Sequence, residues 1–235
     1  MTLFTDICLC TCLVCIATSA NAEREIDLNS VVQAGEINTT TDTRNLSVAV
    51  ERRIAYVIGN NDYEYVSDLK NAENDARLFA AYLATEGYSV SEHYDLTKLG
   101  FEQVLRKIAR ETDENTHVLI YFAGHGVQIG ESNYLIPTDS ALRNASEVSL
   151  QAISLNNIME VAKSRSRTLV VFLDSCRDNP FAGRAFSNTL SGNEVVAETG
   201  FNAQQAPINT FLAFSTSPGL LAEDGLGENS PFTEA

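Results

Sequence analysis

The chain has 235 residues, of which 44% are hydrophobic, and this is enough to build one globular domain of ordinary core size. Its formal net charge of −15 argues against a nucleic-acid partner, because binding to a phosphate backbone relies on clustered Lys and Arg. The same charge attracts basic peptides.

The first 22 residues have the pattern of a secretory signal peptide. An apolar stretch from Ile7 to Ala17 is followed by small residues that end at Ala22. The stretch is too short to span a bilayer comfortably, so we expect cleavage after Ala22 and an exported, periplasmic or secreted protein. The segment lacks Lys and Arg and carries Asp6, and an uncleaved apolar anchor is the alternative interpretation.

Removal of this segment would leave one cysteine, Cys176. The other four lie inside the segment, at Cys8, Cys10, Cys12 and Cys15. A lone cysteine cannot form an intramolecular disulfide, so it is either a buried inert thiol or a reactive one. The polar residues that flank Cys176 favour the reactive interpretation.

Residues 23–52 lack sustained periodicity, which predicts a linker or flexible arm before a domain over residues 53–235. The domain is expected to begin with a strand over residues 53–58. A helix then starts near Asn71 and stops at Gly87, because apolar residues between them recur at helical spacing.

Strand and helix patterns continue to alternate along the chain. Residues 88–94 read as a strand, and the apolar spacing from Phe101 to Ile108 predicts a second helix. Further strands are predicted over residues 118–123, 168–173 and 210–214, with a third helix over residues 153–162. This alternation predicts an α/β fold with a mostly parallel central sheet covered by helices on both faces.

The stretch from residue 180 to 209 is rich in Gly, Asn and Ser, and it predicts a long loop that is either functional or disordered. Arg184 in this loop is a candidate autocleavage site, with an ordinary surface arginine as the alternative. Near the end, Ser230 is a good N-cap and Pro231 suits the first helical position, so a helix begins just before the last residue. We therefore expect the domain to be truncated at its carboxyl end.

Two apolar runs each end at a reactive residue, His125 after the first and Cys176 after the second. In an open α/β sheet, the loops after the strand carboxyl ends form the functional crevice, so the two residues can meet there as a dyad. Imidazole can take and return the thiol proton, and the backbone N–H groups of Gly126 and Cys176 are candidate oxyanion donors. The alternatives are a turn histidine and a buried thiol.

The sequence resembles the caspase-like cysteine peptidases, and most closely their bacterial metacaspase-type members. The resemblance rests on four segments in order, and it covers the chain from about residue 53 onwards. The segments are Gly124 to Gly126, Asn133 to Pro137, Asp174 to Arg177, and Phe214 to Ser217. Cys176 follows His125 by 51 positions, close to the offset of about 50 found in caspases. The resemblance implies a caspase-like three-layer sandwich and a cysteine-type endopeptidase, a thiol protease with His125 as base and Cys176 as nucleophile.

The resemblance also implies a specificity pocket with two acids. Asp75, on the first helix, and Asp174, two residues before the cysteine, match its acidic positions. Two carboxylates would pair with a substrate Arg or Lys, so protein or peptide substrates with basic residues are expected. The structural alternatives are a helix-dipole role for Asp75 and a turn-capping role for Asp174.

We expect no cofactor and no metal site. Many metacaspases bind calcium through acids where this chain has Asn156 and Asn157, and neutral amides bind a hard cation less well than carboxylates do. His93 and His117 border predicted strands and lack the further ligands of a zinc site. The rival functions are a catalytically idle caspase-like module that takes part in protein–protein interaction and, last, a doubly wound ligand binder, for which the nucleotide signature is missing.

Overall fold

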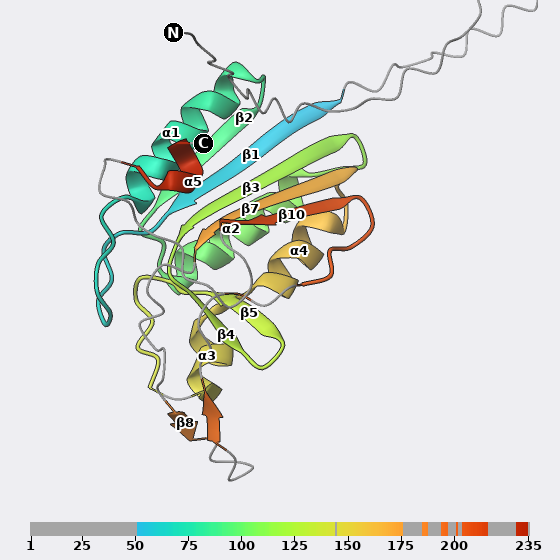
Figure 1. The fold of residues 1–235 in the computed structure, drawn as a ribbon. Helices are drawn as coiled ribbons and strands as arrows, with labels where there is room; N and C mark the ends of the chain where they lie inside the picture. The colour runs from blue at the N-terminus through green and yellow to red at the C-terminus, as the bar shows by residue number, and fades with distance from the viewer. Residues whose placement is uncertain are drawn as a thin grey trace, which may run out of the picture. The chain divides into compact units, whose positions relative to one another are not determined.

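A parallel sheet forms the centre of the computed structural model, which describes residues 51–143, 145–175, 185–187, 194–196, 201, 204–215 and 229–234. Within these residues the sheet has the strand order β10-β7-β3-β1-β2, and every neighbouring pair is parallel. The strands are β1 (Arg52–Gly59), β2 (Ser89–Tyr94), β3 (Thr116–Gly124), β7 (Thr168–Ser175) and β10 (Thr210–Phe214). Figure 1 shows them side by side, and the predicted α/β class is confirmed.

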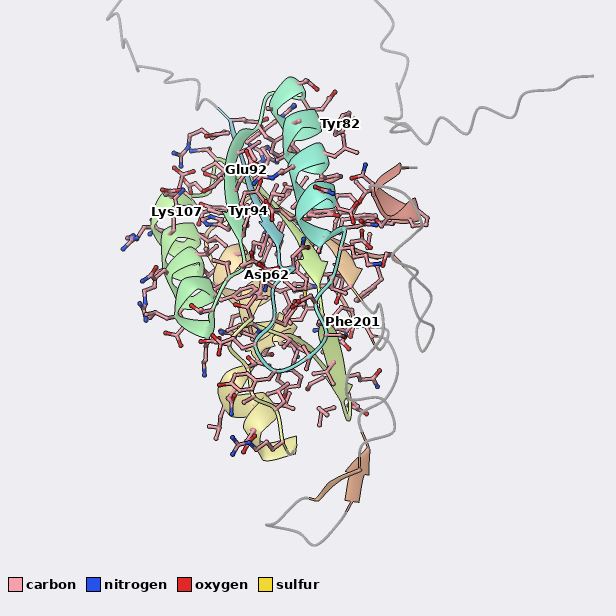
Figure 2. The ribbon with its side chains drawn as sticks, turned by 90° about the vertical axis from the view of Figure 1, so that its left-hand side faces the viewer. Asp62, Tyr82, Glu92, Tyr94, Lys107 and Phe201 are labelled. Atoms are coloured by element: carbon pink, nitrogen blue, oxygen red, sulfur yellow. The ribbon has the colours of Figure 1, made fainter. Side chains whose placement is uncertain are left out.

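Helices cover both faces of this sheet. On one face lies α1 (Ala72–Thr85), and on the other lie α2 (Lys98–Glu111) and α4 (Leu155–Lys163). Figure 2 shows α1 and α2 on opposite sides of the strands. The central strand β3 is buried on both sides because its side chains alternate between two cores. Val118, Ile120 and Phe122 pack with α2 and α4, whereas Leu119, Tyr121 and Ala123 pack with α1. This explains the unbroken apolar run in β3.

A second, small antiparallel sheet was not predicted from the sequence. It contains β4 (Gly126–Ile129), β5 (Ser132–Leu135) and β6 (Ile153–Ser154) in that order. The helix predicted from residue 153 therefore begins at Leu155, because the two preceding residues pair with β5. Strands of two to four residues are too short to show a period in the sequence.

Among the described residues, the remaining short elements are two helices and two strands outside the two larger sheets. The short helix α3 (Ala145–Gln151) was not predicted, and the expected long loop contains β8 (Ala185–Ser187) and β9 (Glu194–Val196). The terminal helix α5 (Pro231–Glu234) begins where the N-cap pattern predicted. No helix in the described part of the chain is long and apolar enough to cross a membrane. The predicted signal peptide, nearly all of the predicted arm, Cys176 and Arg184 lie outside the described residues.

Candidate active site

The register between β3 and β7 sets the position of His125. The last residue pair between these two strands is Gly124 with Ser175, and His125 follows Gly124 directly. Ser175 is in turn followed in the sequence by Cys176, which lies outside the described residues. Adjacent strands of a sheet are about 4.8 Å apart, so the register brings the two chain positions that precede the predicted dyad to neighbouring places.

The surroundings of His125 fix both its main chain and its ring. The residue is only 1% exposed. Its backbone N–H donates to the Tyr63 hydroxyl at 2.8 Å, and its carbonyl accepts from the Ile136 N–H at 3.0 Å. The ring nitrogen Nε2 lies 2.8 Å from the carbonyl oxygen of Ser67. A carbonyl can only accept, so Nε2 carries the proton and Nδ1 is the basic nitrogen of the neutral imidazole.

Gly126 lies where the backbone is too crowded for a side chain. A Cβ at this position would lie 2.3 Å from Cζ of Phe201 and 2.6 Å from Oγ of Ser175. Leu135 of β5 lies opposite Gly126. The ladder hydrogen bond is made by their neighbours, since the Ile136 N–H donates to the His125 carbonyl, so Gly126 and Leu135 form a non-hydrogen-bonded pair. The N–H of Gly126 therefore points away from β5.

Asp75 and Asp174 converge on one residue of the terminal helix, Ser230. Both carboxyl residues are fully buried, Asp75 in the first turn of α1 and Asp174 near the end of β7. The Ser230 backbone N–H donates to Oδ1 of Asp75 at 2.8 Å, and its hydroxyl donates to Oδ2 of Asp174 at 2.5 Å. The hydroxyls of Tyr121 and Thr233 lie 3.3 Å from the same Asp174 oxygen. The structure thus brings the two predicted specificity residues together, around a serine that sequence reasoning had assigned only as a helix cap.

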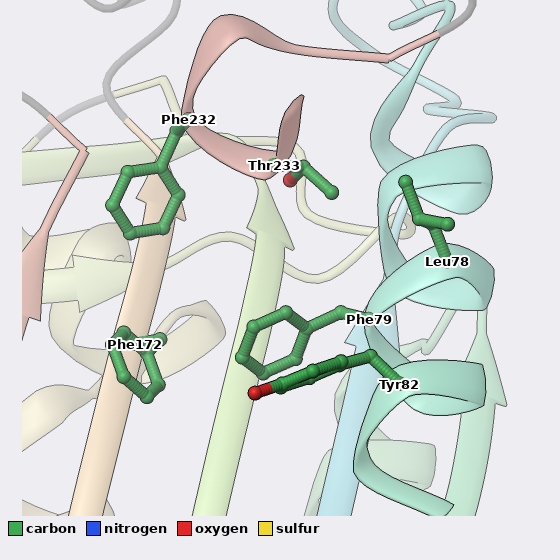
Figure 3. Close-up of a pocket in the computed structure, with 6 residues that line it drawn as sticks. All are labelled: Leu78, Phe79, Tyr82, Phe172, Phe232 and Thr233. Carbon is green, nitrogen blue, oxygen red and sulfur yellow. The ribbon is translucent and has the colours of Figure 1, made fainter. Parts of the chain in front are cut away.

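An apolar pocket of about 660 Å³ lies beside this acid pair, and Figure 3 shows its walls. It is lined by Leu78, Phe79, Tyr82, Phe172, Phe232 and Thr233. Phe79 also stacks on Tyr121, with ring centroids 4.5 Å apart. The pocket lies on the α1 face, and neither His125 nor Gly126 lines it, so it is not the space in which the predicted dyad would act.

Three of the positions considered for metal binding, Asn156, His93 and His117, have hydrogen-bond partners within the protein. The side-chain oxygen of Asn156, in the first turn of α4, accepts a hydrogen bond from Gln204. His93 bonds to the Ser91 hydroxyl at 3.1 Å, and His117 bonds to the Thr168 hydroxyl at 2.7 Å. Within the described residues, no three His, Cys, Asp or Glu side chains are grouped so that they could hold a metal ion.

Sequence reasoning missed Tyr63, Ser67 and Phe201. Tyr63 and Ser67 lie in the loop between β1 and α1, where no periodicity distinguishes one polar or aromatic residue from another. Phe201 stands in the glycine- and asparagine-rich stretch, where its large apolar side chain was the one available signal, and the structure shows that it is buried.

The chain is partly similar to curated proteins and to a solved structure. The chain is 25% identical over 154 residues to the human mucosa-associated lymphoid tissue lymphoma translocation protein 1, a match over 65% of this chain and 18% of that protein. The mouse homologue is 26% identical over 126 residues, which is 53% of this chain and 15% of the homologue. The chain thus spans less than a fifth of the length of these curated relatives. A solved structure from Geobacter sulfurreducens matches with a TM-score of 0.45 and 18% identity, over 54% of this chain and 51% of that one.

A family model gives the broadest match. The model for the caspase domain aligns with residues 52–235, which is more than three quarters of the chain. It begins at the first residue of β1, takes in the whole parallel sheet, and contains every residue of the predicted dyad and acid pair. The chain therefore belongs to the caspase domain family.

Proposed function

We propose that the chain is a cysteine endopeptidase in which Cys176 attacks the peptide bond and His125 transfers the protons. The observation that carries the proposal is the pairing of Gly124 with Ser175, because each predicted dyad residue follows one member of this pair. Membership of the caspase domain family supports a cysteine peptidase at the level of the family.

The tautomer of His125 supports a defined sequence of proton transfers. With its proton held on Nε2 by the Ser67 carbonyl, the imidazole accepts the Cys176 thiol proton at Nδ1. The thiolate then adds to the substrate carbonyl carbon, and the imidazolium returns the proton to the departing amine as the C–N bond breaks. In the second half, His125 takes a proton from water, the hydroxide oxygen adds to the thioester carbon, and the thiolate leaves.

Gly126 is the proposed partner of Cys176 in stabilising the oxyanion. The Gly126 N–H points away from the β4–β5 ladder, so it is not used by that pairing. Backbone donors aimed at the developing negative charge cost no reorganisation during the reaction, which is why they are effective.

The acid pair supports cleavage after Arg or Lys. A guanidinium presents five N–H donors, and charge-assisted bonds to carboxylates are about twice as strong as neutral ones. A substrate arginine therefore competes favourably with the Ser230 hydroxyl for Asp174. Because Asp75 and Asp174 are fully buried, binding of the basic side chain requires the Ser230 cap to give up part of its bonding to them.

The proposal includes no cofactor and no calcium requirement. Calcium takes six to eight oxygen ligands, and the Asn156 oxygen at the matching position is bonded to Gln204. Addition of a chelator should leave the cleavage rate unchanged. Export is also part of the proposal, and sequencing of the protein's amino terminus after expression in a secreting host should give Glu23 as the first residue.

The direct test uses the full chain and peptides that differ only in the residue before the cut. We expect cleavage after Arg and Lys, with little after Asp, Asn or Ala, and none by the variant Cys176→Ala. Autocleavage after Arg184 should appear in the wild type and be absent from the same variant. Cleavage after Asp would overturn the acid-pair assignment. No cleavage with or without calcium would overturn the peptidase proposal and favour the idle, protein-binding module.

A further inference from the structure

Tyr63 contacts His125 in two ways, although neither residue type nor spacing marked it in the sequence. The tyrosine is 7% exposed, and its hydroxyl oxygen accepts the His125 backbone N–H at 2.8 Å. Its ring lies against the imidazole, with centroids 4.6 Å apart and planes inclined at 55°. These contacts are made to His125 itself, so any influence of Tyr63 on the reaction acts through the histidine.

The loop that carries Tyr63 also carries the second partner of the histidine. The Tyr63 backbone N–H donates to the Asp68 carboxylate at 2.8 Å, which ties the two ends of this short stretch together. Ser67 lies inside the stretch and presents its carbonyl to Nε2 of His125. One loop thus fixes the main chain of His125 through Tyr63 and the imidazole through Ser67.

The Tyr63 hydroxyl can accept the His125 N–H in the same protonation state over a wide range of pH. Burial raises the pKa of Tyr63 well above its ordinary value, although hydrogen bonds from His125 and Asn60 act in the opposite direction. The hydroxyl therefore stays neutral at every pH at which a peptidase would be assayed. Its close approach also needs a glycine before the histidine, because a Cβ at Gly124 would lie 2.8 Å from the Tyr63 hydroxyl.

We propose that Tyr63 is a positioning residue that holds His125 with Nε2 toward the Ser67 carbonyl, which keeps Nδ1 as the basic nitrogen of the ring. The inference rests on the proposed function, since it concerns the residue assigned there as the general base. Loss of the phenol oxygen leaves a buried N–H without that acceptor and lets the His125 main chain shift. A displacement of about 1 Å near reacting atoms can cost about a hundredfold in rate.

The kinetic test compares Tyr63→Phe with Tyr56→Phe in the full chain. Tyr56 is a matched control, because it is fully buried and its hydroxyl bonds to Glu111 at 2.9 Å on the α2 face. We expect Tyr63→Phe to lower kcat about tenfold or more, to change KM little, and to move the acidic limb of the pH profile. Tyr56→Phe should leave these three quantities at wild-type values. Equal kinetics and pH profiles for Tyr63→Phe and the wild type would overturn the inference.

A spectroscopic test does not depend on activity. The chain has only three histidines, so the imidazole nitrogens can be resolved by ¹⁵N NMR. In the wild type, His125 should carry its proton on Nε2, and Tyr63→Phe should lower the fraction of this tautomer and shift the pKa of His125. An unchanged tautomer and pKa would contradict the inference. An inactive wild type with a changed His125 spectrum in Tyr63→Phe would overturn the proposed peptidase and keep the positioning role.

Discussion

His125 and the acid pair lie at the same edge of the sheet, but the fold holds them in different ways. His125 is fixed by a loop between β1 and α1, through the Tyr63 hydroxyl and the Ser67 carbonyl. Asp75 and Asp174 depend on Ser230, which is 155 positions from Asp75 in the sequence. The partners of His125 thus come from this loop and from Ile136, which directly follows β5. The serine partner of the acid pair comes instead from the residue that caps α5, far from Asp75 in the sequence.

The difference also concerns which atoms provide the bonds. The Ser67 carbonyl is a main-chain acceptor that a substitution does not remove, so we expect the orientation of the imidazole to tolerate a change of side chain at that position. The bond to Asp174 comes from the side chain of Ser230 and is lost with one substitution. We expect changes near His125 to affect turnover and changes near Ser230 to affect substrate binding and stability.

The largest expected effect follows from filling the space at Gly126. In Gly126→Ala, the new methyl group meets Phe201 and Ser175, so the backbone beside His125 must move. We predict that kcat/KM for an arginine peptide falls by about a hundredfold and that the free energy of unfolding falls by about 1–3 kcal/mol. Peptide hydrolysis and urea unfolding measure the two quantities.

A glycine in a helix provides the control for this variant. Gly100 lies in α2, and a Cβ there approaches only the flexible end of Leu96 and the Thr97 side chain. Gly100→Ala should retain wild-type kcat/KM. Equal losses of activity in the two variants would mean that the Gly126 effect is not specific to the site.

Removal of one charge from the acid pair should give the next largest effect. Asp174→Asn keeps an acceptor oxygen for Ser230 but loses the charge that attracts a basic side chain. We predict that KM for an arginine peptide rises about tenfold, whereas kcat changes little. Steady-state kinetics with arginine and alanine peptides measure this.

An exposed carboxylate serves as the comparison. Asp113 bonds to Thr116 and Arg52 at the opposite end of β3, and Asp113→Asn should leave KM unchanged. If Asp174→Asn raised KM equally for arginine and alanine peptides, the acid pair would not be selecting basic residues.

Loss of the Ser230 hydroxyl should have a smaller effect, mainly on stability. Ser230→Ala removes the donor to Asp174 and the acceptor for the Thr233 N–H. We predict a loss of about 1 kcal/mol in the free energy of unfolding, as is typical for removal of an N-cap. The serine that precedes α4, Ser154, makes no side-chain cap hydrogen bond, so Ser154→Ala should cost less than about 0.5 kcal/mol. Indistinguishable urea midpoints for these two alanine variants would contradict the assigned role of Ser230.

The smallest expected effect concerns His93, which lies outside the candidate site and should influence only the pH dependence of stability. Burial, together with the nearby Lys107 ammonium, lowers the pKa of His93 below its ordinary value. The folded state thus binds a proton at His93 less readily than the unfolded state does, and stability falls as the pH drops through the unfolded pKa toward the lower folded one. Between pH 7 and pH 5, His93→Gln should show a shallower decline in the free energy of unfolding than the wild type. Parallel urea curves at each pH provide the measurement, and identical declines would contradict this role of His93.

The sequence by itself determined the layers of the fold, and it led to the proposed chemistry of the candidate site. Apolar periodicity predicted the alternating strands and helices, since burial on one or two faces leaves a regular pattern in the chain. The residue types at two strand ends predicted the dyad positions, because parallel strands bring their carboxyl ends to one edge. The cap of α5 was also predicted, since Ser230 and Pro231 are local signals.

Only the tertiary structure decided which groups hold these residues. The small sheet of β4, β5 and β6 has strands too short to leave a period, and the pairing of β5 with β6 joins segments about 20 residues apart. Tyr63, Ser67 and Ser230 became partners of the site through hydrogen bonds between segments 56 to 155 positions apart. A hydrogen bond depends on distance and direction in space, and a polar residue in a loop has the same appearance in the sequence whether or not the fold gives it a buried partner.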